Sequence, residues 1–288
     1  MENERNMQVL FRVLNSLSGD VKQKLLPETD SDENLACKFA QFFNDKIESI
    51  RNMIQSERNS MDTSSHSWNI VPESNNNTQT LSEFIPLNDD QLKETFISMN
   101  KKFYEFDPIP IMILKECFSD LCPLILNIVN TALTSGEFPN AFKHATVTPI
   151  IKNNDLDVEE LKSYRPISKT PAISKLLEKT AEEQIKLHLT QNNLESNYQS
   201  AYRKNHSCET AIFKIVNDIQ EEIFNNRLAL LVMLDLSAAF DTIDHDILLD
   251  ILRNRFKISG TTLKFIESYL QNRTFSVCIG NASSDKCP

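Results

Sequence analysis

The sequence predicts an α+β fold, and three observations support this class. First, apolar residues recur at three- and four-residue steps along most of the chain, which is the spacing of amphipathic helices. Second, only three short stretches favour strands, at residues 145–151, 228–236 and 273–280. Third, 40% hydrophobic and 24% charged residues are ordinary for a globular protein with a packed core. Helices should therefore dominate, with few strands among them.

Helices are expected where the apolar spacing is regular. The clearest spans residues 34–55, where Leu35 and Phe39 begin an apolar stripe and Asp30 or Ser31 can cap the first turn. The other helices are expected at 88–100, across 110–135 as a pair broken near Pro123, at 171–190, at 207–225 behind a Ser207 cap, at 246–256 and at 261–271.

The strands are indicated by β-favouring and continuous apolar runs. Val147 and Ile150 lie in the first of them, at 145–151. The run LALLVMLDL at 228–236 is apolar almost without interruption, which predicts a buried strand. A final strand is expected to begin at 273–280.

A polar stretch at residues 57–80, rich in Ser and Asn, predicts a linker or disordered loop. It separates a helical segment at 1–56 from a second helical region at 81–140. The remaining part, 141–288, holds all three predicted strands and is expected to form the main domain.

Composition and charge exclude several classes of function. Only four glycines occur in 288 residues, so the glycine-rich phosphate loops of Walker-type and dinucleotide-binding proteins are excluded. The net charge is −10, but it is uneven. Residues 1–140 carry 12 Lys and Arg against 21 Asp and Glu, whereas residues 141–288 carry 18 against 19. A basic surface for nucleic acid should therefore be a local feature of the second half.

The sequence also predicts an intracellular protein, in the nucleus or the cytoplasm. No apolar run reaches the 18 residues that suggest a transmembrane helix, so no membrane partner is expected. The amino terminus MENERNMQVL lacks the basic and then apolar pattern of a secretion leader. The six cysteines form no CxxC pair and are expected to be reduced and buried.

Asp235 is the residue that most directly suggests chemistry. It follows an apolar run, and a carboxylate at the end of a buried strand needs a neutralising partner. A divalent metal is one such partner, and hard oxygen ligands suit Mg²⁺. Transfer of a nucleotidyl group commonly uses two such ions held by a few carboxylates. The alternative is that Asp235 caps a turn, just as Asp241, Asp244 and Asp246 are expected to cap the helix that follows them.

Several ordered blocks resemble a known family. The stretch LDLSAAFDTIDHDILL (234–249) is similar to the first catalytic motif of reverse transcriptases from non-LTR retrotransposons of the LINE type, in the jockey and chicken-repeat groups. SYRPISKTPAISKLLEK (163–179) resembles the YRPIS motif of that family, and QSAYRKNHSCETA (199–211) resembles its QSGFR-x-x-HSTETA motif. Further similar segments are FAQFFNDKIESIR (39–51), DPIPIMILKEC (107–117), FPNAFKHATVTPIIK (138–152) and SYLQNRTFSV (268–277).

The resemblance implies a right-hand polymerase, with fingers and an incomplete palm over 141–288 and a helical N-terminal extension at 81–140. Residues 1–56 resemble the region between the endonuclease and the polymerase. The implied function is that of an RNA-directed DNA polymerase, a nucleotidyltransferase of a transposable element. Its partners would be template RNA, a DNA primer and deoxynucleoside triphosphates, and its cofactor two Mg²⁺ ions.

The resemblance also implies roles for individual residues. Asp235 matches the first catalytic and metal-binding aspartate, and the carbonyl of Leu236 matches a second metal contact. Lys152 and Arg165 match the residues of the fingers that hold the triphosphate, where Arg offers a planar fork and Lys a point charge. Ala238, Ala239 and Phe240 match positions that contact the incoming nucleotide.

Phe240 and Arg203 each leave two interpretations open. Phe240 matches an aromatic gate that leaves no room for a 2′-hydroxyl, although most phenylalanines are ordinary core residues. Arg203 would shape the junction of fingers and palm or touch the template. The family usually has Gly at the position of Ala201, and the loss of that glycine is expected to restrict the local backbone.

The chain alone is expected to be inactive. The family needs a Y/F-A-D-D turn, and no pair of aspartates follows Asp235 in this sequence. With a single carboxylate, two divalent ions are not expected to bind in place. The chain is thus interpreted as a partial polymerase, and the alternative is a non-catalytic RNA-binding or interaction module derived from such an element.

Overall fold

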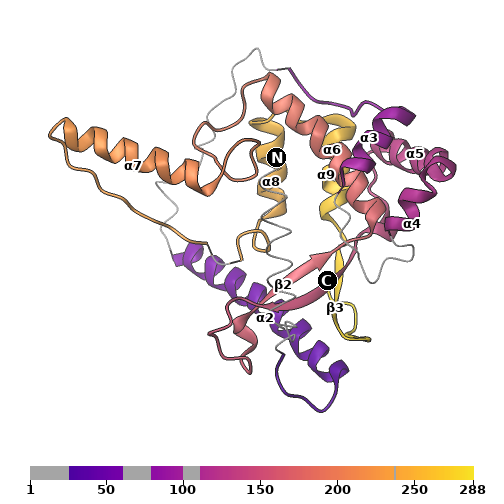
Figure 1. The fold of residues 1–288 in the computed structure, drawn as a ribbon, viewed down its shortest axis with the longest axis horizontal. Coiled ribbons are helices and arrows are strands. Elements are labelled where there is room, and N and C mark those ends of the chain that lie inside the picture. Colours follow the sequence, from indigo (N-terminus) through magenta and orange to yellow (C-terminus); the bar gives the residue numbers. More distant parts are fainter. Residues whose placement is uncertain (1–25, 61–78, 100–110, 237) are drawn as a thin grey trace, which may run out of the picture. The chain divides into compact units, whose positions relative to one another are not determined.

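A computed structural model describes residues 26–60, 79–99, 111–236 and 238–288 of the chain (Figure 1). Within these residues the protein combines helices with one four-stranded sheet. The predicted α+β class is therefore confirmed as a mixed helical and sheet fold. Among the described residues, no helix combines the length and the apolar character needed to span a membrane.

The chain divides into two compact units, each built from separate stretches of sequence. Among the described residues, the sheet unit comprises 26–48, 143–171 and 272–288. The helical unit comprises 49–60, 79–99, 111–142, 172–236 and 238–271.

The sheet unit is built on strand β1, His144–Ile151. This strand pairs antiparallel with β2, Tyr164–Lys169, and parallel with β3, Thr274–Ile279. The short β4, Ala282–Ser283, completes the order β2-β1-β3-β4. The strands predicted near 145–151 and 273–280 are therefore confirmed. A 3₁₀ turn at Leu161–Ser163 leads into β2.

Helix α2, Asp32–Ser60, supplies the other half of the core of the sheet unit. The apolar stripe predicted from its sequence, including Phe39, is buried against strand residues such as Val147 and Tyr164. The hydroxyl of Ser31 accepts a hydrogen bond from the Asn34 amide at 3.2 Å, so Ser31 acts as the expected cap. The predicted helix at 34–55 is thus confirmed and continues to Ser60.

The register of the sheet separates its two faces, because directly paired residues point to the same side. Val147 and Val277 are paired on the face covered by α2. The opposite face holds the pairs Thr146–Lys169 and Ile150–Arg165 between β1 and β2, and His144–Thr274 between β1 and β3. That face is mainly polar and carries Arg165.

His144 joins β1 to β3 and provides a pH-dependent contribution to stability. Its imidazole contacts the Thr274 hydroxyl at 2.9 Å and the Ser276 hydroxyl at 3.3 Å. Burial, and then the charge of Lys286, lower the pKa of His144 from its ordinary value of 6.5. The folded state therefore favours neutral imidazole, and this stabilisation is complete above pH 6.5 and is lost as the pH falls through the lower, folded pKa.

We expect the free energy of unfolding to fall between pH 7 and pH 5, and His144→Asn to flatten this dependence. Urea unfolding at a series of pH values measures the slope. The exposed His206 provides the control, and His206→Asn should leave the slope as it is. An unchanged slope in His144→Asn would show that another group is responsible.

The helical unit contains the remaining helices. Their bounds are α3 Asp89–Ser98, α4 Ile111–Glu116, α5 Phe118–Ser135, α6 Ala172–Gln191, α7 Cys208–Phe224, α8 His245–Asn254 and α9 Gly260–Leu270, with a 3₁₀ turn at Asn140–Phe142. All the predicted helices are confirmed. The pair at 110–135, however, breaks at Cys117 and not at Pro123, which lies inside α5. Cys117 has ψ of 10° and so leaves the helical conformation before the proline is reached.

The core of the helical unit is rich in aromatic rings. Phe96 of α3 stacks on Phe118 of α5 with ring centroids 4.5 Å apart. Phe265 of α9 meets Phe84 and Phe138 edge to face, at 5.3 and 5.7 Å. These contacts join residues from distant parts of the sequence into a single cluster, which also includes Leu176 and Leu177 of α6.

Side-chain caps begin several of these helices, as the sequence indicates. Asp244 accepts hydrogen bonds from the amides of Asp246 and Ile247, so it caps α8 rather than forming part of an acidic site. Ser207 forms a capping box at the start of α7. The cap of α3 is Asn88, and the Asp89-Asp90 pair lies in the first turn.

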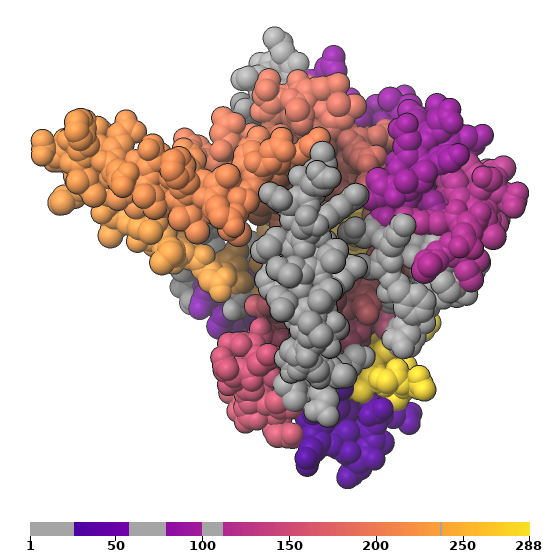
Figure 2. Space-filling view, viewed as in Figure 1, coloured from indigo at the N-terminus to yellow at the C-terminus, as the bar shows by residue number. Residues whose placement is uncertain are grey.

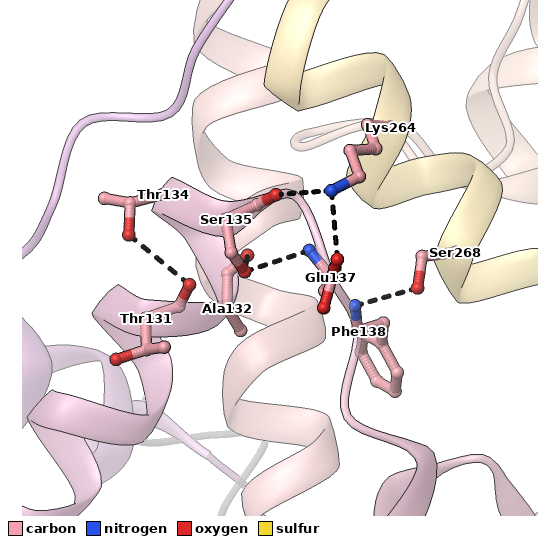
Figure 3. A network of polar contacts seen from close by, with 8 residues as sticks. All are labelled: Thr131, Ala132, Thr134, Ser135, Glu137, Phe138, Lys264 and Ser268. Atoms are coloured by element: carbon pink, nitrogen blue, oxygen red, sulfur yellow. Dashed lines mark hydrogen bonds and ion pairs between the residues drawn. The ribbon is translucent and has the colours of Figure 1, made fainter.

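The end of α5 is held by a network that reaches α9 (Figure 3). Gly136 takes the left-handed conformation that commonly ends a helix. The Lys264 ammonium donates to the Ser135 carbonyl at 3.1 Å and pairs with Glu137 at 3.0 Å. The Phe138 amide donates to the Ser268 hydroxyl at 3.0 Å. These bonds fix the position at which the chain leaves the helical unit.

The buried strand predicted at 228–236 is absent, and this prediction is wrong. The segment has no regular secondary structure, and all of its side chains are exposed. The preceding helix α7 has no buried residue, and its side chains (orange) lie at the surface in Figure 2. An apolar run becomes a strand only when a neighbour pairs with its backbone, and none of the described strands pairs with this segment.

Two further predictions lie largely outside the described residues. The polar linker at 57–80 overlaps the end of α2 at 57–60, while 61–78 are not described. The sequence also predicts a turn around Asp107-Pro108, and these two residues fall outside the described part of the chain. The division of the chain at the linker stays a prediction.

Candidate functional site

The first part of the candidate site is the β1–β2 hairpin, which carries Lys152 and Arg165. Lys152 follows β1, and its amide donates to the Ser163 carbonyl at 2.8 Å. Arg165 lies in β2 and is paired with Ile150 of β1. Ile150 is two residues before Lys152. Both cationic side chains are exposed. The antiparallel pairing therefore brings together two residues that are 13 positions apart in the sequence.

The electrostatics of the hairpin confirm that these cations are near neighbours. The pKa of Lys152 is lowered first by burial and then by the charges of Lys46 and Arg165. The Lys152 ammonium also donates to the Lys162 carbonyl at 2.6 Å, which fixes its direction. Cations that repel one another in this way attract a polyanion, because a single anionic group relieves the repulsion of all three.

Lys46 was not identified from the sequence. It lies on the exposed side of α2, one turn beyond the buried Phe43. Its contribution depends on α2 packing against the sheet, a contact between segments about a hundred residues apart. Helical periodicity indicates that position 46 is exposed, but it carries no information on which strand lies beside it.

The second part of the candidate site is the segment around Asp235, which belongs to the helical unit. Asp235 and Leu236 are exposed and lie outside any helix or strand. The expectation of a carboxylate at the end of a buried strand is therefore wrong. The resemblance implies that Lys152 and Arg165 face Asp235 across a cleft. This stays a prediction, because those cations belong to the sheet unit.

The fit of the described residues to a metal site is incomplete. Among the described residues, no group of three or more His, Cys, Asp or Glu side chains is arranged to hold a metal ion. Asp235 offers one carboxylate and Leu236 one carbonyl oxygen, whereas a pair of divalent ions needs several carboxylates. The described residues therefore do not fit a complete two-ion centre.

Ala238 begins a compact turn after Asp235. Its φ of 51° is in the left-handed region, and its carbonyl accepts the amides of Asp241 at 2.9 Å and Thr242 at 3.1 Å. The guanidinium of Arg51 donates to the Asp241 carbonyl at 3.3 Å. This turn places Ala239 and Phe240 at the surface, so both remain accessible to a ligand.

Phe240 is not an ordinary core residue, because 71% of it is exposed. Its ring meets Tyr202 edge to face, with centroids 6.2 Å apart and planes at 80°. Tyr202 is itself 77% exposed and has a φ of 61°, which is uncommon for a bulky residue. Tyr202 was not identified as a site residue from the sequence, although it lies in the QSAYR motif next to Arg203.

Arg203 organises the loop that carries Tyr202. Its guanidinium donates to the carbonyls of Ser196 at 2.9 Å and Gln199 at 3.5 Å, and it lies 3.6 Å from the Glu195 carboxylate. These bonds hold the loop at 195–203 together, and the role of Arg203 at the junction of fingers and palm or at the template stays a prediction. Ala201 has no positive φ, so the loss of glycine there is tolerated, and the left-handed residue is its neighbour Tyr202.

Comparison with known proteins finds similarity in the second half of the chain. Residues 150–286 match the family described as reverse transcriptase (RNA-dependent DNA polymerase). This range includes both parts of the candidate site, from Lys152 to Phe240. Members of this family generally use divalent metal ions.

Three polymerases of mobile elements are similar over about half of the chain. A probable RNA-directed DNA polymerase from transposon BS of Drosophila melanogaster is 27% identical over 157 residues, which is 54% of this chain and 17% of that protein. The RNA-directed DNA polymerase from mobile element jockey is 27% identical over 161 residues in Drosophila melanogaster, covering 56% and 17%. Its counterpart in Drosophila funebris is 30% identical over 152 residues, covering 52% and 16%. The aligned part thus spans about a sixth of the length of these relatives.

Proposed function

We infer that this chain is part of an RNA-directed DNA polymerase of a jockey-type non-LTR element. Two findings support this inference: residues 150–286 match the reverse transcriptase family, and about half of the chain is similar to polymerases of mobile elements. In this proposal the β1–β2 hairpin belongs to the fingers and the segment around Asp235 to the palm. The ligands are template RNA, a DNA primer and deoxynucleoside triphosphates.

One observation carries the proposal furthest, namely that the β1–β2 pairing brings Lys152 and Arg165 together, with Lys46 of α2 near them. Burial, and then the charges of Lys46 and Arg165, lower the pKa of Lys152, and the hydrogen bond to the Lys162 carbonyl orients its ammonium. A triphosphate carries enough negative charge to pair with all three. The planar fork of Arg165 can bind two phosphate oxygens, while the lysines act as point charges.

The second part of the proposal concerns sugar selection and metal binding. We assign Phe240 as the gate that excludes a 2′-hydroxyl, and the backbone of Ala238 and Ala239 as a surface for the nucleotide. Phe240 suits this role because its ring is accessible and Tyr202 supports its edge. Asp235 and the Leu236 carbonyl would contribute to binding Mg²⁺, which neutralises the charge that develops during nucleotidyl transfer.

A non-catalytic RNA-binding module is the second candidate, and the incomplete fit to a metal centre favours it. Both functions use the same cationic hairpin and differ only in the chemical step. We expect the chain to bind without incorporating nucleotide, because Asp235 is the one metal-binding carboxylate that the family resemblance locates in it.

The test is binding of a labelled deoxynucleoside triphosphate to the chain in the presence of an RNA–DNA template–primer and Mg²⁺. Each of Lys152→Ala and Arg165→Ala should weaken binding roughly tenfold or more, since each removes a charge-assisted contact to phosphate. The control is Lys186→Ala, an exposed lysine of α6 that is paired with Glu182.

Unchanged binding by both hairpin variants would contradict the assignment of the hairpin. Primer extension in the same samples separates the two functions. Incorporation that Asp235→Asn abolishes would identify an active polymerase, whereas binding without incorporation fits the module.

A further inference from the structure

Two cations meet where β1 and β3 begin, at the opposite end of β1 from the proposed triphosphate site. The strands run parallel, and their first paired residues are His144 and Thr274. The residues immediately before them are Lys143 and Arg273. The Thr274 amide donates to the Lys143 carbonyl at 3.3 Å, so the two strands start side by side. Neighbouring strands lie about 4.8 Å apart, which makes Lys143 and Arg273 close neighbours.

Lys143 is buried in a way that is unusual for lysine. The residue is only 5% exposed, and no hydrogen bond or ion pair of its ammonium is found among the described residues. In the described part of the chain, the Thr262 hydroxyl is the one side-chain polar atom that is both inaccessible to solvent and without a hydrogen-bond partner. Because the Lys143 ammonium also has no partner but does not meet this criterion, it keeps some contact with solvent.

An unpaired buried cation is costly, and the surroundings increase that cost. Burial lowers the pKa of Lys143 first, and the charge of Arg273 lowers it further. Two cations therefore lie side by side at this strand end in a chain whose net charge is −10. Such an arrangement is stabilised when an anion occupies the space between them.

We propose that Lys143, together with Arg273, binds a phosphate group at the common start of β1 and β3, and that this phosphate belongs to the backbone of a bound nucleic-acid strand. Lys143 and Lys152 flank the eight residues of β1, so an extended strand separates them by about 30 Å. The site at Lys143 is therefore a second phosphate site, distinct from the triphosphate cluster. The choice of nucleic acid as the source of the phosphate rests on the proposed function, whereas the phosphate site itself does not.

Lys143→Met tests the site because methionine keeps an unbranched apolar side chain and removes the charge. If the charge of Lys143 serves anion binding and not stability, Lys143→Met without ligand should melt at the same temperature as the wild type or higher, because an uncompensated charge has been removed. Wild-type protein should be stabilised by inorganic phosphate, and Lys143→Met should not. Binding of a 12-nucleotide RNA should weaken roughly tenfold in the variant, with a salt dependence reduced by about one phosphate contact.

Lys143→Arg, which keeps the charge, should retain binding, and the exposed Lys186→Met should behave as the wild type. A loss of RNA binding without a phosphate effect would also support a site for the nucleic-acid backbone. Stabilisation by phosphate in a protein that binds no RNA would keep the site and refute the proposed function. The proposal would be overturned if wild type and Lys143→Met bound RNA equally and were stabilised equally by phosphate. It would also be overturned if the wild type neither bound RNA nor was stabilised by phosphate.

Discussion

Phe39→Ala is expected to destabilise the sheet unit by about 3–5 kcal/mol, the range measured for removing a buried phenylalanine ring from a core. Phe39 is fully buried, and its ring lies 5.0 Å from that of Tyr164 and 5.6 Å from that of Phe43. The contact with Tyr164 is edge to face, a geometry that adds to the effect of burial. Because Tyr164 is the first residue of β2, the cavity would open directly beneath the hairpin.

The consequence of Phe39→Ala should extend to ligand binding. Lys46 lies near Lys152 and Arg165 because α2 and the hairpin share this core, and the same core supports the hairpin. Triphosphate binding should therefore be lost in parallel with stability. Urea unfolding followed by circular dichroism, together with nucleotide binding, measures both effects. Met53→Ala, at an exposed position of α2, is the control and should change stability by less than about 0.5 kcal/mol. A Phe39→Ala protein as stable as this control would show that α2 does not support the sheet.

The role of α2 shows what sequence patterns predict well and what they leave open. Its apolar stripe predicts a helix and the buried face, because periodicity is a local property. That face packs against strands β1, β2 and β3, whose residues follow more than a hundred positions later in the sequence. No local pattern specifies this partner. The same limit applies to the parallel pairing of β1 with β3, which brings Lys143 beside Arg273. The resemblance identifies Lys152 and Arg165, but Lys46 becomes visible only after the fold is known.

The segment at 228–236 shows the opposite case, in which a strong local pattern is not followed. Its apolar run predicts a strand, yet a strand depends on partners for its backbone, and propensity cannot supply them. Asp235 is consequently exposed instead of lying at a buried strand end. The contact between Phe240 and Tyr202 was equally unpredictable, because it joins two separate turns. Tyr202 in one turn and Ala238 in the other have positive φ angles.

Gly260→Ala is expected to destabilise the helical unit by about 3 kcal/mol or more, through backbone strain and a steric clash together. Gly260 has φ of 53°, which an alanine adopts only at a cost. A Cβ at this position would lie 2.4 Å from the carbonyl oxygen of Ser82, a backbone atom that cannot rotate away. Ser82 is held there because its carbonyl also accepts the Thr262 amide, and the neighbouring Leu81 carbonyl accepts the Ser259 amide.

Gly280→Ala is a matched comparison that separates the two contributions. Gly280 has a similar φ of 57°, but its Cβ would meet the Asp32 carboxylate, the end of a flexible side chain, at 2.9 Å. Strain alone should make Gly280→Ala less stable by about 1–2 kcal/mol, with the side chain of Asp32 moving aside. Chemical unfolding of both variants measures the difference. If the two substitutions destabilise the protein equally, the contact with Ser82 does not restrain the start of α9, and the segment around Leu81 is free to move away from the turn at 257–262.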